Sequence, residues 1–309
     1  MVKENDIIIC GYPSIDQMIQ LDSTPKIGRT STIVKESMSN KLYGGCSVNI
    51  AYAMSALGIR CGLSMIVGND FESSGFKSFL EKGRIAIDDV LVNTKLPTSH
   101  TYLIANQKNE QMTLFYPGPM AVEHERKYAD PKIDGKSLLI TIGNLYRNQL
   151  ILDQAIEKGI PVFFSMKGDL ASLNQSYIKK VLKNCQIIFM NEAEKEMLDN
   201  LLGENILNNI GHDKLQAIIV TKGSKGSTCY TNDKYIDMGI APFGKIVDTT
   251  GCGDAYIAGF LSSYLQGEDI ESCMASGSVM SSFVIERFGC LTNIPNREDF
   301  NKRKKEFWT

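Results

Sequence analysis

Short, mainly apolar runs alternate with amphipathic stretches along most of the chain. The apolar runs are Ile7–Cys10, Cys61–Val67, Leu138–Ile142, Val162–Ser165, Ile187–Met190 and Ala217–Thr221. Hydrophobic residues recur at helical spacing near 44–57, 74–82, 147–158, 175–183 and 192–201. Apolar strands that alternate with helices are buried on both faces. The pattern therefore predicts an α/β fold with a mostly parallel sheet that is covered by helices on each side.

Two regions, 17–38 and 99–116, depart from this pattern. Polar and apolar residues alternate in them, and a turn at 106–109 makes the second region a candidate hairpin. Because no helix separates their strands, we expect a small separate sheet, which is either an edge hairpin or a lid over a site. Beyond Asp248 the pattern is helical, at about 253–266, 270–287 and 297–306.

Composition narrows the class of protein without naming a function. The chain has 309 residues, of which 43% are hydrophobic and 22% charged, and its formal net charge is −2. No basic field points to nucleic acid, and no apolar stretch approaches the roughly 18 residues of a membrane helix. The charged N-terminus is unlike a secretory signal. The eight cysteines form no C-x-x-C pair, so we expect free thiols in a reducing, cytoplasmic compartment.

Asp254 stands at the predicted start of an apolar helix, after Gly251 and Gly253. Flexible backbone before a helix lets successive N–H groups converge on one anion, and the helix N-terminus adds positive potential. A carboxylate there repels phosphate, but it makes sense as a general base that acts on a hydroxyl while the backbone holds the phosphoryl group. Spacing alone leaves a second interpretation open, in which Asp254 caps the helix and the glycines form a turn.

The segment from Asp248 to Asp254 reads D-T-T-G-C-G-D. It resembles the C-terminal signature of the ribokinase or PfkB family of carbohydrate and nucleoside kinases, usually D-T-x-G-A-G-D. Cys252 replaces the alanine, a small-for-small change that keeps the backbone donors. The resemblance implies that Asp254 is the catalytic base and that the anion hole consists of Gly251, Cys252, Gly253 and Asp254.

Other positions are similar to the same family in order and spacing. Gly44 and Gly45, followed by Asn49, match its first signature, in which the glycines let the substrate approach and the asparagine binds sugar hydroxyls. Asp16, after the first strand, matches the aspartate that binds two substrate hydroxyls. Taken singly, these residues also fit a helix start and a turn.

The nucleotide side of the resemblance rests on two shorter motifs. Asn191 and Glu194 resemble the N-x-x-E element near magnesium and the phosphates. Thr221, Gly223 and Gly226 resemble the T-x-G-x-x-G nucleotide loop. Each motif alone is common, as a helix start and as a turn.

The resemblance covers about residues 7–297 and implies a three-layer αβα, ribokinase-like fold. It implies one domain over 1–309, with the lid formed by 17–38 and 99–116. It further implies ATP, Mg²⁺ bound to Glu194 through water, and a monovalent cation such as K⁺ near Asp248 and the Thr250 carbonyl. Because lids of this family often pair between subunits, a homodimer is expected. Nucleic acid and membrane partners are not.

The acceptor is the open part of the prediction. We expect phosphorylation of a hydroxymethyl group of a small sugar, with a nucleoside as the alternative, for which Phe115 and Tyr116 would supply a wall. Residues 165–169 depart from the acidic, Arg-bearing segment of typical ribokinases and fructokinases, which weakens the case for any named sugar. A non-catalytic sensor has no need of Asp254. A dinucleotide-dependent oxidoreductase lacks its G-x-G-x-x-G motif here. The kinase interpretation requires Asp254 to face a cleft without a permanent ion pair.

Overall fold

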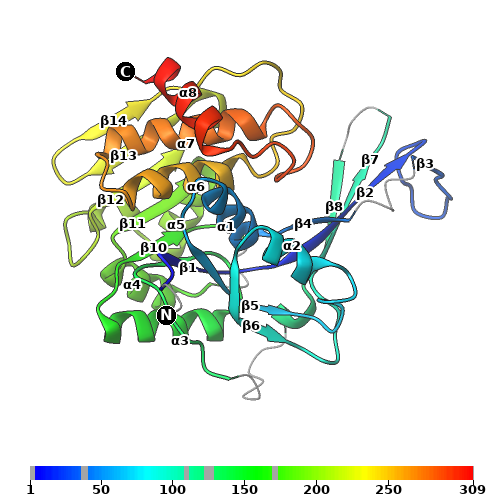
Figure 1. The fold of residues 1–309 in the computed structure, drawn as a ribbon, viewed down its shortest axis with the longest axis horizontal. Helices are drawn as coiled ribbons and strands as arrows, with labels where there is room; N and C mark the ends of the chain where they lie inside the picture. The colour runs from blue at the N-terminus through cyan, green and yellow to red at the C-terminus, as the bar shows by residue number, and fades with distance from the viewer. Residues whose placement is uncertain (1–3, 36–40, 108–110, 122–128, 169–172, 309) are drawn as a thin grey trace.

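The computed structural model describes residues 4–35, 41–107, 111–121, 129–168 and 173–308. Within them, a nine-stranded sheet runs through the body of the molecule in the order β14–β13–β12–β11–β10–β9–β1–β5–β6 (Figure 1). Neighbouring strands are parallel from β12 to β6, and β13 and β14 add an antiparallel edge. The strands are β1 (Ile7–Cys10), β5 (Cys61–Val67), β6 (Ala86–Val92), β9 (Leu138–Ile140), β10 (Val162–Ser165), β11 (Ile187–Asn191), β12 (Ala217–Thr221), β13 (Ser227–Thr231) and β14 (Tyr235–Met238).

Both faces of this sheet are buried, because alternate residues of a strand enter two different hydrophobic cores. Ile7 and Ile9 of β1 belong to the core that includes residues of α1, α2, α6, α7 and α8. Ile8 and Cys10 belong to the core that includes residues of α3, α4 and α5. The predicted parallel sheet with helices on each side is confirmed. The helices are α1 (Cys46–Ala56), α2 (Phe76–Lys82), α3 (Leu145–Lys158), α4 (Gln175–Asn184), α5 (Glu192–Leu202), α6 (Cys252–Tyr264), α7 (Ile270–Val284) and α8 (Arg297–Phe307).

A second, smaller sheet projects from one side of the body (Figure 1). Its strands lie in the order β3–β2–β7–β8, with β4 also paired to β2. The regions 17–38 and 99–116 contribute to β2, β3, β7 and β8, and their residues 36–38 and 108–110 lie outside the described part of the chain. These strands are β2 (Ser14–Leu21), β3 (Ile33–Lys35), β4 (Leu42–Gly44), β7 (His100–Ala105) and β8 (Gln111–Tyr116).

The hydrophobic pattern missed three strands of the main sheet, β6, β13 and β14. The edge strands β6 and β14 carry polar residues and are only partly buried, so they lack the continuous apolar run that identifies a central strand. The helix predicted at 253–266 spans Cys252–Tyr264. Among the described residues, no helix has the length and apolar character needed to cross a bilayer.

Candidate active site

The start of α6 forms a sharp turn that only glycine accommodates well. Gly251 is the N-cap of α6 with φ 79°, and a Cβ there would lie 2.8 Å from Cys290. The Cys252 N–H donates to the Thr249 carbonyl over 3.2 Å, so it is used within the turn. No described residue accepts a hydrogen bond from the N–H groups of Gly253 and Asp254, which leaves these two donors for an anion.

Asp254 lies in the first turn of α6 and is 5% exposed. Its Oδ2 accepts a hydrogen bond of 2.9 Å from Nδ2 of Asn49, a residue of α1. Its Oδ1 lies 2.8 Å from Nζ of Lys167. Asn49 Oδ1 is buried and accepts no hydrogen bond from any described residue. Buried acceptors are normally satisfied, so this oxygen is available to a hydroxyl group of a bound molecule.

Asp16 faces the same place from the small sheet. A Cβ at Gly44 would lie 3.0 Å from Asp16 Oδ2 and 3.2 Å from Asn49 Oδ1, so the missing side chain leaves open the space between them. Ser14 Oγ donates to Asp16 Oδ1 over 2.5 Å and pairs with Thr101 Oγ1 of β7 at 2.8 Å. Burial raises the pKa of Asp16, against the lowering effect of these hydroxyl groups.

The adjoining Gly45 fixes how α1 begins. Its φ is 95°, and a Cβ there would lie 2.1 Å from the Tyr12 carbonyl oxygen. Glycine is therefore needed for the close approach of α1 to the chain that follows β1. This packing places Asn49 opposite Asp254.

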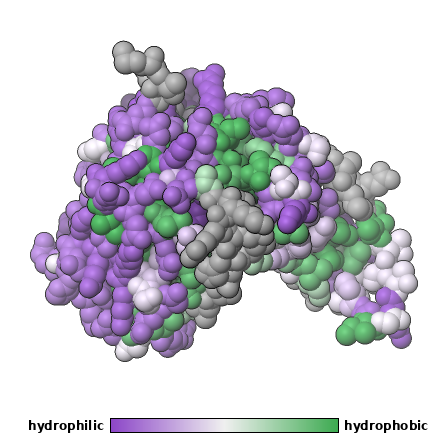
Figure 2. Space-filling model, turned by 90° about the horizontal axis from the view of Figure 1, so that it is seen from below, coloured by the Kyte–Doolittle hydropathy of each residue, from purple (hydrophilic) through white to green (hydrophobic). Residues whose placement is uncertain are grey.

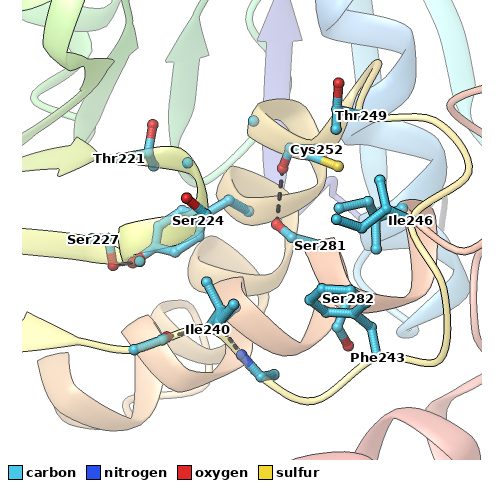
Figure 3. A pocket seen from close by; sticks show the side chains of 18 residues that line it. Thr221, Ser224, Ser227, Ile240, Phe243, Ile246, Thr249, Cys252, Ser281 and Ser282 are labelled. Atoms are coloured by element: carbon cyan, nitrogen blue, oxygen red, sulfur yellow. Dashed lines mark hydrogen bonds between the residues drawn. The ribbon is translucent and has the colours of Figure 1, made fainter.

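A cavity of about 330 Å³ lies beside the anion hole, between the β12–β14 edge and helices α6 and α7 (Figure 3). Thr221, Gly223 and Gly226 line one side of it, and Cys252 and Gly253 line another. The structure thus brings together the predicted nucleotide loop and the predicted anion hole. Sequence analysis missed its apolar wall, formed by Ile240, Phe243, Ile246 and Ile285.

Asn191 and Glu194 form a reciprocal capping box at the start of α5. Asn191 Oδ1 accepts from the Glu194 N–H, and Glu194 Oε2 accepts from the Asn191 N–H, each over 2.8 Å. The reciprocal pair engages only one of the two Glu194 carboxylate oxygens. Burial raises the pKa of Glu194, against the hydrogen bond from Asn191. These residues line a small cleft that also contains Lys167, Thr221 and Gly253.

The donor set fits a loosely held Mg²⁺. Within the described residues, no cluster of three His, Cys, Asp or Glu side chains could enclose a metal. Mg²⁺ gives up its waters reluctantly and is commonly held by one or two carboxylates and substrate phosphates. One carboxylate at the edge of a phosphate site agrees with that mode of binding.

Asp248 ties the α6 turn to a distant loop. Its Oδ1 accepts from the Thr250 N–H over 2.9 Å, and its Oδ2 accepts from the Gly289 N–H over 3.0 Å. Both oxygens are therefore engaged with backbone. A monovalent cation near Asp248 and Thr250 stays a prediction.

Lys167 was not found by sequence analysis. It follows the carboxyl end of β10, and its Nζ lies 2.8 Å from Asp254 Oδ1. The requirement that Asp254 stand without an ion pair is therefore not met by this structure. The contact is a close ion pair between a half-buried ammonium and a buried carboxylate. Burial lowers the pKa of Lys167, but attraction to Asp254 and Glu194 raises it overall, so this side chain is a permanent cation.

Comparison with known proteins places this geometry in context. Residues 12–297 match the pfkB family of carbohydrate kinases. The chain is 32% identical to a nucleoside kinase of Methanocaldococcus jannaschii, over 95% of this chain and 94% of that protein. It is 30% identical to a nucleoside kinase of Methanothermobacter thermautotrophicus, over 100% of this chain and 98% of that protein. The crystal structure of the M. jannaschii enzyme matches with a TM-score of 0.89 and 30% identity, over 98% of this chain and 99% of that chain.

Proposed function

Because the chain belongs to the pfkB family of carbohydrate kinases and is a phosphotransferase, we propose that it transfers the γ-phosphoryl group of ATP to the hydroxymethyl group of a nucleoside. The observation that carries this proposal is the placement of two acceptor oxygens at one space. A Cβ at Gly44 would lie 3.0 Å from Asp16 Oδ2 and 3.2 Å from Asn49 Oδ1, and Asn49 Oδ1 is buried without a partner among the described residues. Asp254, which is hydrogen-bonded to Asn49, stands in the first turn of α6 beside them. A polyol bound there would satisfy Asn49 Oδ1 and Asp16 with its hydroxyl groups.

Each group in this arrangement has one task. Asp16 and Asn49 hold the hydroxyl groups of the acceptor. Asp254 takes the proton of the reacting hydroxyl as its oxygen bonds to the γ-phosphorus and the bond from phosphorus to the β–γ bridging oxygen breaks, which releases ADP. The N–H groups of Gly253 and Asp254 hold the phosphoryl charge. Glu194 would hold Mg²⁺ through water, and the ion would supply positive charge to the phosphates.

The nucleoside acceptor is favoured by an aromatic pair next to Asp16. Phe115 of β8 pairs in register with Thr101, which in turn pairs with Asp16, so these three residues share one face of the small sheet. The Phe115 ring meets the Tyr12 ring edge-on, at 5.6 Å and 88°. A base has an apolar face that such rings can contact, whereas a free sugar does not need them. A free sugar remains the second candidate, because Asp16 and Asn49 bind hydroxyl groups of either.

The small sheet is proposed as the lid and as the contact between two copies of the chain. Figure 2 shows apolar surface along the projecting sheet. Met112 and Leu114 are 48% and 49% exposed and lie on the face opposite Phe115, and Ile33 and Val34 of β3 are also exposed. Covering these residues with a second lid removes apolar area from water. Light scattering on the intact protein measures whether a dimer forms.

The acceptor is tested by coupled ADP release with a panel of nucleosides, free pentoses and hexoses at matched concentration. We expect several nucleosides to give the highest kcat/KM values. If a free sugar exceeds every nucleoside, the acceptor is a sugar and the phosphotransferase assignment stands. ADP release without any acceptor serves as the blank for hydrolysis.

A further inference from the structure

The Lys167 ammonium lies between the two halves of the site. It is 2.8 Å from Asp254 Oδ1, and 3.8 Å from the position that a Cβ would take at Gly253. It shares the small cleft with Glu194 and Gly253. The cation therefore stands beside both the carboxylate that takes the proton and the amides that would hold the phosphoryl group.

The Lys167 side chain is able to change its partner. It is 25% exposed, whereas the Asp254 side chain is 7% exposed, and it lines the small cleft. A lysine has a flexible four-carbon stem, and its ammonium has no preferred fork geometry to give up. The contact with Oδ1 is an ion pair, so a bound group with more negative charge can compete for the ammonium.

Without nucleotide, the ion pair between Lys167 and Asp254 stabilises a buried carboxylate. Asp254 is almost fully buried, and an unpaired buried carboxylate is costly. Lys167 offsets that cost, but its ammonium also occupies the position beside Oδ1 that an acceptor hydroxyl would have to reach. A kinase whose base stayed in this state would be slow.

A bound triphosphate changes the balance of charge. Its terminal phosphoryl group carries more negative charge than one carboxylate and, at the amides of Gly253 and Asp254, it lies next to Lys167. We propose, on the basis of the function given above, that Lys167 is a catalytic residue that leaves Asp254 for the γ-phosphoryl group when the nucleoside triphosphate binds. Asp254 is then released for the hydroxyl proton only when the donor is in place.

Lys167 and Asp254 would then act in the same phosphoryl transfer, one on the phosphoryl charge and the other on the hydroxyl proton. Lys167 stabilises the charge on the γ-phosphoryl oxygens while the acceptor oxygen forms its bond to phosphorus and the bridging oxygen departs with ADP. The hydroxyl proton passes to Asp254 Oδ1, the oxygen that the ammonium has left. The ammonium gives up no proton in this step.

The test compares Lys167→Met, which removes the charge, with Lys167→Arg, which keeps it. Lys304→Met is the matched control, because Lys304 is a partly buried lysine that is paired with Glu268, beyond the C-terminal end of α6. Calorimetry measures the affinity for ADP and for β,γ-imido-ATP, and coupled ADP release measures kcat.

We expect Lys167→Met to lower kcat by about 10²-fold, the usual effect of losing one preorganised group that binds transition-state charge. It should weaken β,γ-imido-ATP about tenfold or more while leaving ADP nearly unaffected, since only the former carries the γ-phosphoryl group. Lys167→Arg should keep most of the wild-type kcat and most of the affinity for β,γ-imido-ATP. Lys304→Met should change neither quantity.

The proposal is overturned if Lys167→Met binds both nucleotides like the wild type, or if its kcat stays the same or rises. A fall in thermal stability alone, with an unchanged ratio of the two affinities, also overturns it. The affinity ratio is measured without an acceptor. It therefore still tests Lys167 if the wild-type protein phosphorylates no nucleoside, which is the result that counts against the proposed acceptor.

Discussion

Asn49 and Asp254, 205 residues apart in the chain, are joined by a buried hydrogen bond of 2.9 Å between Nδ2 and Oδ2. The bond fixes the carboxylate so that its other oxygen, Oδ1, points away from Asn49 Nδ2. It also orients the Asn49 amide, whose oxygen is left unsatisfied. One side-chain hydrogen bond thus links the first turns of α1 and α6.

Replacing Asp254 with asparagine is expected to lower the rate of ADP release by about 10²–10⁴-fold, the usual contribution of a general base. The new amide keeps an oxygen for Asn49 but cannot take the hydroxyl proton. Coupled ADP release gives the rate, and calorimetry with ADP shows whether the nucleotide site is intact. Near-normal turnover in this variant contradicts the role of Asp254 as base.

A methyl group at Gly44 should weaken binding of the acceptor without weakening binding of the nucleotide. Its Cβ would lie 3.0 Å from Asp16 Oδ2 and 3.2 Å from Asn49 Oδ1. We expect Gly44→Ala to raise the acceptor KM about tenfold, the scale of overpacking by one methyl group, with little change in the KM for ATP. Gly244→Ala is the control, because its Cβ would meet only Glu286 Oε1 at an ordinary 3.8 Å. Equal changes in both KM values would argue for a general structural effect.

Acceptor binding should weaken at a higher pH than it would if the pKa of Asp16 had the usual aspartate value. Burial raises the pKa of Asp16, and the ionised form accepts the substrate hydroxyl groups. As the pH falls through this raised pKa, Asp16 gains a proton and loses acceptor capacity, so the acceptor Kd rises. Calorimetry without ATP measures the Kd across the acid range. Asp16→Asn should bind weakly at every pH, and a steep acid limb in that variant would assign the titration to another group.

Phe115→Ala is expected to separate nucleosides from free sugars. The variant loses the ring that meets Tyr12 at 5.6 Å beside the acceptor site. An aromatic contact contributes about 0.5–1.5 kcal/mol beyond buried area, so the nucleoside KM should rise about three- to tenfold. The KM for a free pentose, measured in the same assay, should not change. A matching rise for the pentose would remove the reason to place a base against Phe115.

The central strands and the start of α6 could be predicted from sequence because both are local. A continuous apolar run such as Ile187–Met190 identifies a buried strand, and the glycines before Asp254 mark the helix start within a few residues. The α5 capping box, formed by Asn191 and Glu194, is another short-range feature, and the structure shows both of its hydrogen bonds.

Lys167 and the apolar wall of the cavity beside α6 could not be predicted in this way. Lys167 lies in a coil segment after β10, and its importance comes from a partner 87 residues later, Asp254, which no local pattern connects to it. Ile240, Phe243 and Ile246 lie in an irregular stretch without helical or strand periodicity. They become a wall only because α6 and α7 pack against the edge of the sheet.

The order of the elements has a consequence for biosynthesis. The last strand, β14, ends at Met238, whereas α6 begins at Cys252, and one hydrophobic core of the sheet includes residues of α6, α7 and α8. While the ribosome is still adding the C-terminal fifth of the nascent chain, that face of the strands has no α6, α7 or α8 to cover it. The interval leaves apolar surface open to aggregation or to a chaperone, and phosphotransferase activity cannot begin before it closes.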